Sequence, residues 1–204
     1  MACILELQDI KKYFKTQKGV LHAVDGISFR QEAGTTLGVV GESGCGKSTL
    51  GYLILHLLES SGGKMFYEGK DVTKLSKKEL VEYRQKVRII FQDPYSSLNP
   101  RMTVSQTIRE PLRIRGGMSG AEMDKEVTRL MDMVGLASRY ANSYPHELDG
   151  GRRQRIGIAR ALALKPNYIV CDEPVSALDV SIQAQVINLM LDLQEELKLT
   201  YLFV

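Results

Sequence analysis

Apolar and polar side chains alternate with two different periods along this chain. Residues 4–10 alternate between the two kinds, which predicts a half-buried strand, and residues 23–29 predict a second strand. In residues 180–197 the apolar side chains instead recur at helical spacing, which predicts a helix with one buried face. The chain therefore combines strands and helices, and we expect an α/β fold.

A glycine-rich segment lies between a strand pattern and a helix pattern. Residues 35–40 form a short apolar run, and residues 47–58 have the length and apolar content of a helix. A strand, a glycine loop and a helix in this order are the context that a phosphate-binding loop requires. We therefore treat residues 41–48 as a candidate phosphate-binding site.

The middle of the chain has a different character. Residues 93–101 are rich in proline and asparagine and predict turns, and helical patterns follow at 104–115 and 121–134. Other predicted elements are strands at 87–91, 168–171 and 199–204 and a helix at 153–164. The expected organisation is a core that begins in residues 1–92, a helical subdomain at 93–152, and a second part of the core in 153–204.

Composition limits the class of protein. With 204 residues, 44% apolar and 25% charged, the chain is typical of one soluble globular domain with an inserted lobe. The net charge of +3 is too small to indicate nucleic-acid binding, and no apolar run has the length of a membrane span. Three cysteines at unrelated spacings fit a reducing compartment, and the first residues lack a signal-peptide pattern. We therefore expect a cytoplasmic protein.

The segment Gly41-Glu-Ser-Gly-Cys-Gly-Lys-Ser48 carries the strongest candidate chemistry. Its glycines allow successive backbone N–H groups to turn toward a phosphate group, at the positive end of the helix that follows. Lys47 would reach the β- and γ-phosphates, and the Ser48 hydroxyl would ligate Mg²⁺. The pattern predicts a site for a nucleoside triphosphate with its magnesium ion.

A buried strand that ends in two carboxylates is the natural partner of this loop. Residues 168–171 are apolar and are followed by Asp172 and Glu173. In phosphoryl transfer, such an arrangement places Asp172 near the metal and Glu173 near the attacking water. Acidic residues are common at strand ends, so this pattern gains its weight from the phosphate loop upstream.

Five segments, in this order, resemble the ATP-binding subunits of ABC transporters, and closely those of dipeptide and oligopeptide importers. They are GESGCGKSTLG at 41–51, FQDPYSSLNPRMTV at 91–104, YPHEL at 144–148, QRIGIARALAL at 154–164 and CDEPVSALDVSIQAQ at 171–185. The resemblance covers nearly the whole chain. It implies a phosphate-loop NTPase (RecA-like) core, an N-terminal antiparallel β-subdomain and an inserted α-helical subdomain.

The resemblance also implies roles for individual residues. Phe14 matches the aromatic residue that stacks on adenine, with Tyr13 as the alternative, and Gln92 matches a glutamine that contacts Mg²⁺ and the attacking water. The implied sets are Lys47, Gln92 and Glu173 for catalysis; Ser48, Gln92 and Asp172 for magnesium; Phe14, Gly41, Glu42, Ser43, Gly44, Cys45, Gly46, Lys47, Ser48 and Thr49 for ATP; and Ser176 and Asp179 for the loop by which two ATPase subunits sense each other.

The signature segment departs from the family pattern. The family usually has Leu-Ser-Gly-Gly-Gln, where this chain has Leu148-Asp149-Gly150-Gly151-Arg152. In the family, this segment faces ATP that is bound to the other subunit. Asp149 is a good helix N-cap, but its carboxylate would face a γ-phosphate of like charge. Arg152 and Arg153 follow it along a helix closely enough to neutralise the carboxylate. We therefore expect a pair of unequal ATP sites.

A histidine that follows the last strand contacts the γ-phosphate in the family. This sequence ends at Val204, where the predicted strand ends, and His22, His56 and His146 match no such position. We expect that the sequence stops before this switch histidine. Because one transition-state donor contributes about 10²–10³ in rate, we expect this chain to bind ATP but to hydrolyse it poorly.

The resemblance implies partners and a location. The partners are a second ATP-binding subunit, two transmembrane permease subunits that meet residues 92–101, and indirectly an extracytoplasmic solute-binding protein; no nucleic acid is expected. The chain would lie at the cytoplasmic face of the cell membrane.

Two alternative functions remain. One is a soluble ABC ATPase that acts on ribosomes or DNA, which the segment around Gln92 disfavours. The other is a non-catalytic nucleotide-binding regulator, which Glu173 disfavours. The sequence leaves open whether the solute is a dipeptide, an oligopeptide or a nickel complex, and whether the pair is a homodimer or a heterodimer.

Overall fold

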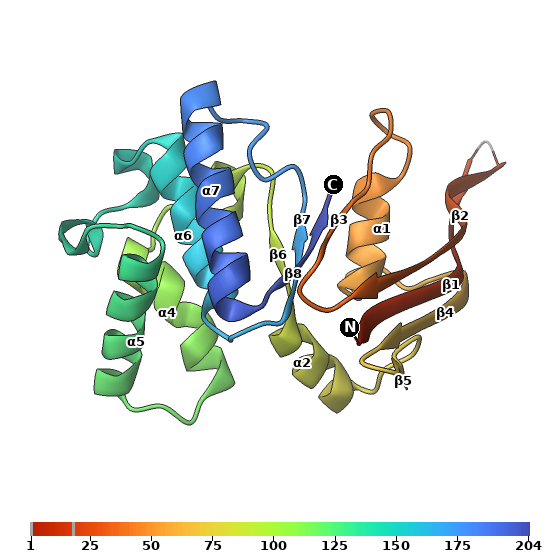
Figure 1. Cartoon of the computed structure of the whole chain (residues 1–204), viewed down its shortest axis with the longest axis horizontal. Coiled ribbons are helices and arrows are strands. Elements are labelled where there is room, and N and C mark those ends of the chain that lie inside the picture. Colours follow the sequence, from red (N-terminus) through yellow and green to blue (C-terminus); the bar gives the residue numbers. More distant parts are fainter. Residues whose placement is uncertain (1, 18) are drawn as a thin grey trace. The chain divides into compact units, whose positions relative to one another are not determined.

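The computed structural model describes residues 2–17 and 19–204 and forms two compact units (Figure 1). The first unit contains Met1–Arg88, Asn167–Asp172 and Leu197–Val204, and the second contains Ile89–Pro166 and Glu173–Glu196. These limits differ from the expected subdomain boundaries at 92/93 and 152/153, because the helix that begins at residue 150 packs with the inserted helices. The subdomain assignment stays a prediction.

Most of the expected elements form, and several begin and end where the sequence pattern does. The strand at 168–171 and the helices at 104–115 and 180–197 are confirmed at both ends. In chain order the elements are β1 (Cys3–Thr16), β2 (Gly19–Glu32), β3 (Thr36–Gly38), α1 (Lys47–Ile54), β4 (Gly62–Tyr67), β5 (Lys70–Asp71), α2 (Lys77–Lys86), β6 (Val87–Ile90), α3 (Pro94–Ser97), α4 (Val104–Arg115), α5 (Gly120–Met133), the 3₁₀ turns η1 (Ser138–Tyr140) and η2 (Pro145–Glu147), α6 (Gly150–Leu162), β7 (Tyr168–Cys171), α7 (Val180–Leu197) and β8 (Thr200–Phe203).

The first unit contains an antiparallel sheet in the order β2-β1-β4-β5, and α1 lies beside it (Figure 1). Strand β1 follows the expected alternation only in part: Leu5 and Leu7 are buried, but Ile4 is buried as well, and Gln8 and Asp9 are both exposed where the pairing with β2 is irregular. The second sheet has the order β3-β8-β7-β6, and β8 pairs in parallel with both β3 and β7. All four residues of β7 are buried, which explains its uninterrupted apolar sequence.

Buried tyrosines tie these two sheets together through their hydroxyl groups. The Tyr168 hydroxyl donates to Gln31 Oε1 at 2.8 Å, and Gln31 Nε2 donates to the Tyr201 carbonyl oxygen at 2.8 Å. The Tyr67 hydroxyl is hydrogen-bonded to Asn167 Oδ1. A buried polar group is costly unless it has a partner, so these bonds allow large polar-tipped rings to fill the core.

The second unit is built on three packed helices, α4, α5 and α6. Reciprocal capping boxes begin two of them, with Thr103 and Gln106 at the start of α4 and Ser119 and Glu122 at the start of α5. Apolar side chains recur on the inward faces of all three; Ile108, Leu112, Leu130 and Ile156 are examples that are almost fully buried. The helical pattern that the sequence predicted here is confirmed. Among the described residues, no helix has the length and apolar character needed to cross a membrane.

Several elements escaped the sequence analysis, among them α2, α3, β4 and β5, and several boundaries differ, since β1 and β2 extend beyond the expected 4–10 and 23–29 at both ends. Helix α2 was missed because Tyr83 is its one buried residue, so the sequence shows no apolar side chains at helical spacing there. Its capping box at Ser76 and Glu79 was nevertheless visible in the sequence. Strand β4 was also missed. The helix expected at 47–58 ends at Ile54, and the helix expected from residue 153 begins three residues earlier, after the N-cap residue Asp149.

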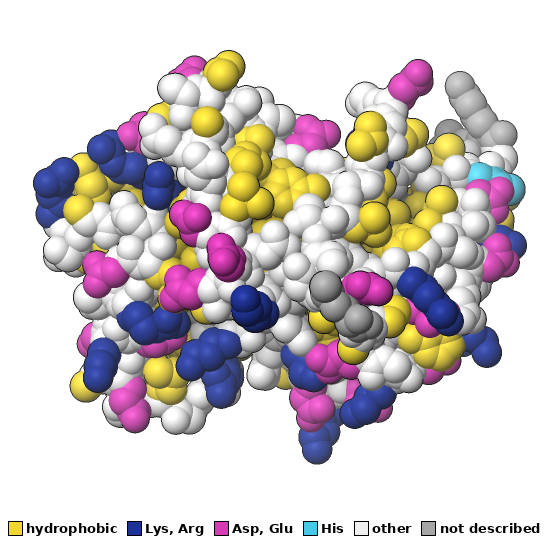
Figure 2. Space-filling model, in the orientation of Figure 1, with side chains coloured by type: hydrophobic (Ala, Val, Ile, Leu, Met, Phe, Trp, Pro, Cys, Tyr) yellow, Lys and Arg dark blue, Asp and Glu magenta, His cyan; other side chains and the backbone are white. Residues whose placement is uncertain are grey.

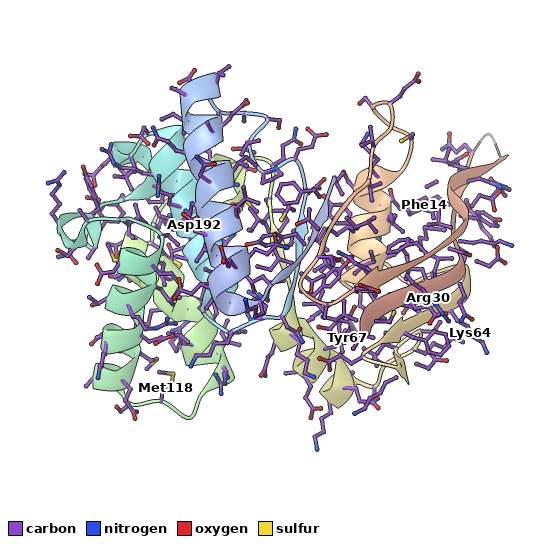
Figure 3. All side chains as sticks on the ribbon, viewed as in Figure 1. Phe14, Arg30, Lys64, Tyr67, Met118 and Asp192 are labelled. Atoms are coloured by element: carbon purple, nitrogen blue, oxygen red, sulfur yellow. The ribbon has the colours of Figure 1, made fainter. Side chains whose placement is uncertain are left out.

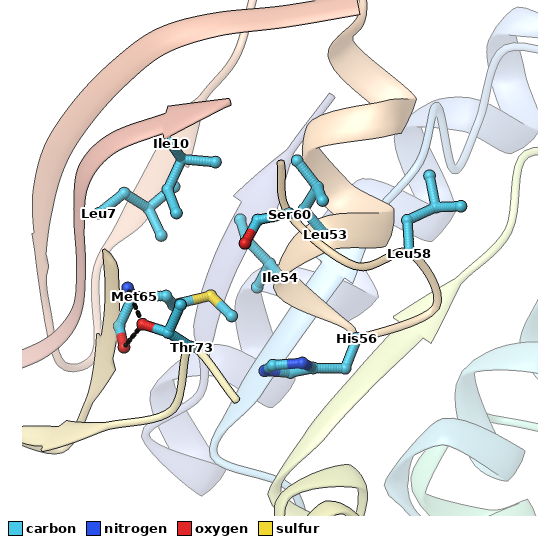
Figure 4. Close-up of a pocket in the computed structure, with 9 residues that line it drawn as sticks. All are labelled: Leu7, Ile10, Leu53, Ile54, His56, Leu58, Ser60, Met65 and Thr73. Carbon is cyan, nitrogen blue, oxygen red and sulfur yellow. Dashed lines mark hydrogen bonds between the residues drawn. The ribbon is translucent and has the colours of Figure 1, made fainter. Parts of the chain in front are cut away.

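His56 lies just beyond α1 in a buried corner of the first unit. It has a positive φ of 51°, and its ring meets Tyr83 edge-on, with centroids 5.0 Å apart. Its Nε2 is buried and has no hydrogen-bond partner among the described residues. Figure 4 shows the ring beside a cavity lined by Leu7, Ile10, Leu53, Ile54, Leu58, Ser60, Met65 and Thr73. Burial, and then the nearby charge of Arg84, lower the pKa of His56.

We predict that His56→Asn weakens the acid sensitivity of folding. The unfolded chain binds a proton at His56 near pH 6.5, whereas the folded chain does so only at lower pH, so His56 makes stability fall as pH decreases through this interval. Asparagine removes the titration and tolerates a positive φ. Urea unfolding at about pH 7.5 and about pH 5.5 measures the loss. His146→Asn, at an exposed site, is the control; an equal loss in wild type and His56→Asn would contradict the prediction.

Candidate functional site

The glycine-rich segment forms a loop between β3 and α1, with the backbone that the sequence predicted. Gly44 and Gly46 both have left-handed conformations, with φ of 80° and 96°. Gly46 is the N-cap of α1, and no side chain caps this helix. The first N–H groups of a helix have no partner within it, so an uncapped start can receive an anion.

Gly46 is also required by the neighbouring chain segment. A Cβ atom at this position would lie 1.9 Å from the carbonyl oxygen of Ala23, on strand β2. No side chain fits there, so the loop and β2 approach each other through their backbones alone. This contact fixes where the loop turns into α1.

Lys47 places a positive charge on the loop. Its ammonium group donates to the carbonyl oxygens of Gly41 and Glu42, each at 2.8 Å, and lies 4.0 Å from Cys45 Sγ. The long flexible stem keeps the charge beside the backbone N–H groups that face a ligand at such a loop. The loop therefore combines two features that favour a phosphate group.

The next residue joins the loop to the end of β7. Ser48 Oγ donates to Asp172 Oδ1 at 2.9 Å, and the Tyr52 hydroxyl donates to the other oxygen, Oδ2, at 3.3 Å. Asp172 is only 6% exposed. Burial, and then the charge of Asp172, raise the pKa of Tyr52, which keeps its hydroxyl protonated as a donor. The sequence analysis missed Tyr52, although it lies four residues after Ser48 and so on the same face of α1.

These residues fit a magnesium ion. The Ser48 hydroxyl and the Asp172 carboxylate already lie within hydrogen-bond distance of each other, and both are hard oxygen ligands. Within residues 2–17 and 19–204, no group of three His, Cys, Asp or Glu side chains could hold a metal by itself. Mg²⁺ rarely needs such a cage, because it usually takes one or two protein ligands together with phosphate oxygens and water.

In the second unit, the predicted glutamine meets the second carboxylate. Gln92 Nε2 donates to Glu173 Oε2 at 2.7 Å and to Ser176 Oγ at 3.2 Å. Glu173 has a positive φ of 46°, which is uncommon for a residue with a side chain. The structure thus brings together Gln92, Glu173 and Ser176, which come from two of the five segments that carry the resemblance. Asp179 lies directly before α7.

The signature segment begins helix α6 and compensates its own unusual charge. Asp149 Oδ1 accepts from the Arg152 backbone N–H at 2.8 Å, and Oδ2 is paired with the Arg152 guanidinium. That guanidinium also lies over the Tyr140 ring, 4.9 Å from its centroid. Of the two arginines expected to neutralise Asp149, Arg152 does so, whereas Arg153 instead donates to the Leu148 carbonyl oxygen. The contribution of Tyr140 was missed because it precedes this segment and belongs to no motif.

The two glycines of this segment are needed for packing. A Cβ at Gly151 would lie 2.6 Å from Ile182 Cγ2, and a Cβ at Gly150 would lie 3.0 Å from Leu178 Cδ2. Both neighbours belong to the second unit, at or near the start of α7. The contact is tightest at Gly151, where an added side chain would displace Ile182, whereas at Gly150 the end of the Leu178 side chain would have to shift only slightly.

The two candidate aromatic residues on β1 have different surroundings. Phe14, labelled in Figure 3, has the Lys12 ammonium 5.0 Å from its ring centroid. Tyr13 stacks on His22 with centroids 4.1 Å apart, and its hydroxyl is hydrogen-bonded to Asp25. Each ring thus has a neighbour over one face, and the stacking role of Phe14, with Tyr13 as the alternative, stays a prediction.

Comparison with known proteins decides the family. Residues 24–176 match the family described as ABC transporter. The chain belongs to the ABC transporter family. It is 53% identical to the oligopeptide transport ATP-binding protein OppF of Bacillus subtilis (strain 168), over 98% of this chain and 67% of that protein. It is 47% identical to the dipeptide transport ATP-binding protein DppF of Escherichia coli (strain K12), over 98% and 62%. The chain thus spans about two thirds of the length of these relatives.

Solved structures of ABC ATPases share the fold. The ATP-binding cassette MJ0796, in a dimeric post-hydrolysis state with ADP and Pi, has a TM-score of 0.84 and 30% identity over 98% of this chain and 87% of that one. The cbiO1 protein of Clostridium perfringens, part of the ABC transporter complex cbiONQ, has a TM-score of 0.86 and 26% identity over 100% of this chain and 78% of that one. The predicted ABC fold, a phosphate-loop core with an antiparallel β-subdomain and a helical insertion, is confirmed.

We predict that Gly46→Ala disrupts the phosphate loop of this ABC protein more than Gly44→Ala does. Both variants place a side chain at a positive φ, which costs about 1–2 kcal/mol, but only the Cβ at residue 46 would collide with Ala23. Urea unfolding followed by circular dichroism should therefore give the lower midpoint for Gly46→Ala. Equal midpoints would show that the loop can move away from β2.

Proposed function

We propose that this ABC transporter chain binds ATP with Mg²⁺ and hydrolyses the terminal phosphate. The observation that carries this proposal is the part-buried hydrogen bond between Ser48 and Asp172, at the start of α1 and the end of β7. It unites a phosphate loop with an acidic strand end, and these are the two parts that phosphate-loop ATPases use to hold magnesium and nucleotide.

Each residue has a distinct task in this proposal. The backbone N–H groups of residues 41–49 bind the phosphates, and Lys47 offsets the charge of their β- and γ-oxygens. Ser48 and Asp172 hold the magnesium ion, which neutralises charge on the phosphate oxygens when it is bound. Phe14 stacks on the adenine ring. The loop binds the phosphates through the backbone of its other residues, which are Gly41, Glu42, Ser43, Gly44, Cys45, Gly46 and Thr49.

Glu173 is the proposed general base. Its Oε2 already accepts a hydrogen bond from Gln92, so its carboxylate is held in one orientation. An ionised carboxylate accepts a proton from an attacking water, and Gln92 would orient that water or the magnesium ion. No covalent intermediate is needed, since phosphoryl transfer depends on positioning and charge stabilisation.

We further propose that the chain works in a peptide transporter. Its relatives carry names for oligopeptide and dipeptide transport, and it matches them over nearly its whole length. In this proposal, residues 93–152 form the signalling subdomain, residues 92–101 meet the transmembrane permease subunits, and Ser176 and Asp179 face a second ATP-binding subunit. The protein would then lie at the cytoplasmic face of the membrane. On the face in Figure 2, basic and acidic side chains are interspersed.

Lys47→Ala tests nucleotide binding. Loss of a charge-assisted contact of about 1.5–3 kcal/mol should weaken binding of MgATP by roughly 10- to 150-fold, measured by titration calorimetry. Lys78→Ala removes an exposed lysine on α2 and should leave the affinity unchanged. Absence of MgATP binding by the wild-type chain, or equal affinities for wild type and Lys47→Ala, would refute the proposal.

Asp149→Ser tests the unequal sites. Serine keeps the N-cap but removes the carboxylate and frees Arg152 from its ion pair, so the segment that would face the γ-phosphate on the other subunit becomes less negative. Two like charges about 4 Å apart repel by about 1 kcal/mol in water, so we expect ATP turnover of the assembled transporter to rise about fivefold. Asp149→Asn, which also keeps the cap, should give a similar rise. Unchanged or lower turnover in both variants would contradict this expectation.

A further inference from the structure

Helix α6 holds the turn after β6 at three points, all within the second unit. Arg160 NH1 donates to the Ser97 carbonyl oxygen at 2.6 Å, and Gln154 Nε2 donates to the Phe91 carbonyl oxygen at 3.5 Å. Between them, the Arg153 guanidinium lies over the Tyr95 ring, 5.1 Å from its centroid. The helix that begins with the signature segment therefore runs along the turn proposed to meet the permease.

Arg153 differs from Gln154 and Arg160 because its side chain contacts both the signature segment and the turn after β6. Its Nε donates to the Leu148 carbonyl oxygen at 2.8 Å, and Leu148 directly precedes the N-cap residue Asp149. The same guanidinium faces the Tyr95 ring. One planar group thus joins the backbone of the signature segment to an aromatic side chain of the turn.

Tyr95 is suited to pass a movement outward. It is 54% exposed although it is a large aromatic residue, and it lies in the short helix α3, whose N-cap is Asp93. Arg160, by contrast, is half-buried, and burial lowers the pKa of its guanidinium. Arg160 therefore anchors the end of the turn at Ser97, while the Arg153–Tyr95 contact lies near the surface.

From these contacts we infer that Arg153 is a positioning residue that couples the signature segment to the permease-facing turn through Tyr95. The inference rests on the proposed function, in which the signature meets ATP of the other subunit and residues 92–101 meet the permease. A displacement of Leu148 moves the Arg153 guanidinium with it, and the guanidinium moves the ring on which it is stacked. Such a contact transmits a change only if the nucleotide and the permease both shift the position of the same structural element. The decisive evidence is therefore energetic coupling between Arg153 and Tyr95.

The test compares ATP turnover with and without the membrane subunits. For each variant, turnover of the transporter assembled in vesicles is divided by turnover of the same ATP-binding subunits alone. A loss of folded protein lowers both values and leaves the ratio unchanged, so a merely structural role would not alter it. The variants are Arg153→Gln, Tyr95→Leu, the double variant, and the conservative pair Arg153→Lys and Tyr95→Phe.

An exposed cation–π contact contributes roughly a two- to fivefold change in an equilibrium. We therefore expect Arg153→Gln and Tyr95→Leu each to lower the ratio roughly two- to fivefold, and the double variant to lower it no further than either alone. Tyr95→Phe, which keeps the ring, and Arg153→Lys, which keeps the cation, should retain most of it. The matched control is Arg155→Gln, whose guanidinium instead donates to the Val134 carbonyl oxygen at 2.6 Å.

The outcomes separate this inference from the function on which it rests. If the wild-type chain fails to bind MgATP or to assemble with membrane subunits, the proposed function fails, and the coupling role fails with it. If wild type assembles and turns over ATP, but Arg153→Gln keeps the wild-type ratio, the coupling role alone is wrong. Independent effects that multiply in the double variant, or an equal loss in Arg155→Gln, would also overturn it.

Discussion

The hydrogen bond from Ser48 to Asp172 joins two residues that lie 124 positions apart, and the candidate site depends on it. It can form because the loop turns into α1 at Gly46, where β2 leaves no room for a Cβ, and because β7 ends at Cys171, directly before Asp172. Tyr52 then occupies the second oxygen of the same carboxylate. The loop, the helix and the strand end are thus held in one arrangement by a backbone contact and two hydroxyl groups.

In the second unit, helix α6 begins in close contact with neighbouring residues. Gly150 and Gly151 let the start of α6 approach Leu178 and Ile182, and Asp149 caps the helix. A carboxylate at this position carries a charge that the family's serine lacks. Arg152 pairs with it, and Tyr140 supports Arg152, so the departure from the usual signature is balanced locally.

Helix α6 therefore both carries the signature segment and contacts the turn after β6. Its first turn carries the signature segment, and its side chains hold the backbone of the turn between Phe91 and Ser97. In the same unit Gln92, which lies in that turn, is bonded to Glu173. Residues proposed to sense nucleotide and residues proposed to meet the permease are thus connected through a few side chains rather than through a long chain of contacts.

The sequence by itself determined the elements whose burial repeats with a regular period, and the motifs whose chemistry is local. Strand β7, helices α4 and α7 and the glycine loop follow from neighbouring residues alone, since spacing and turn geometry act over a few positions. Helix α2 lacked that period, and Tyr52, Tyr140 and the contact of Arg153 with Tyr95 involve partners distant in sequence. Only the tertiary structure decided these, because packing of remote segments brings such side chains together and no local pattern records it.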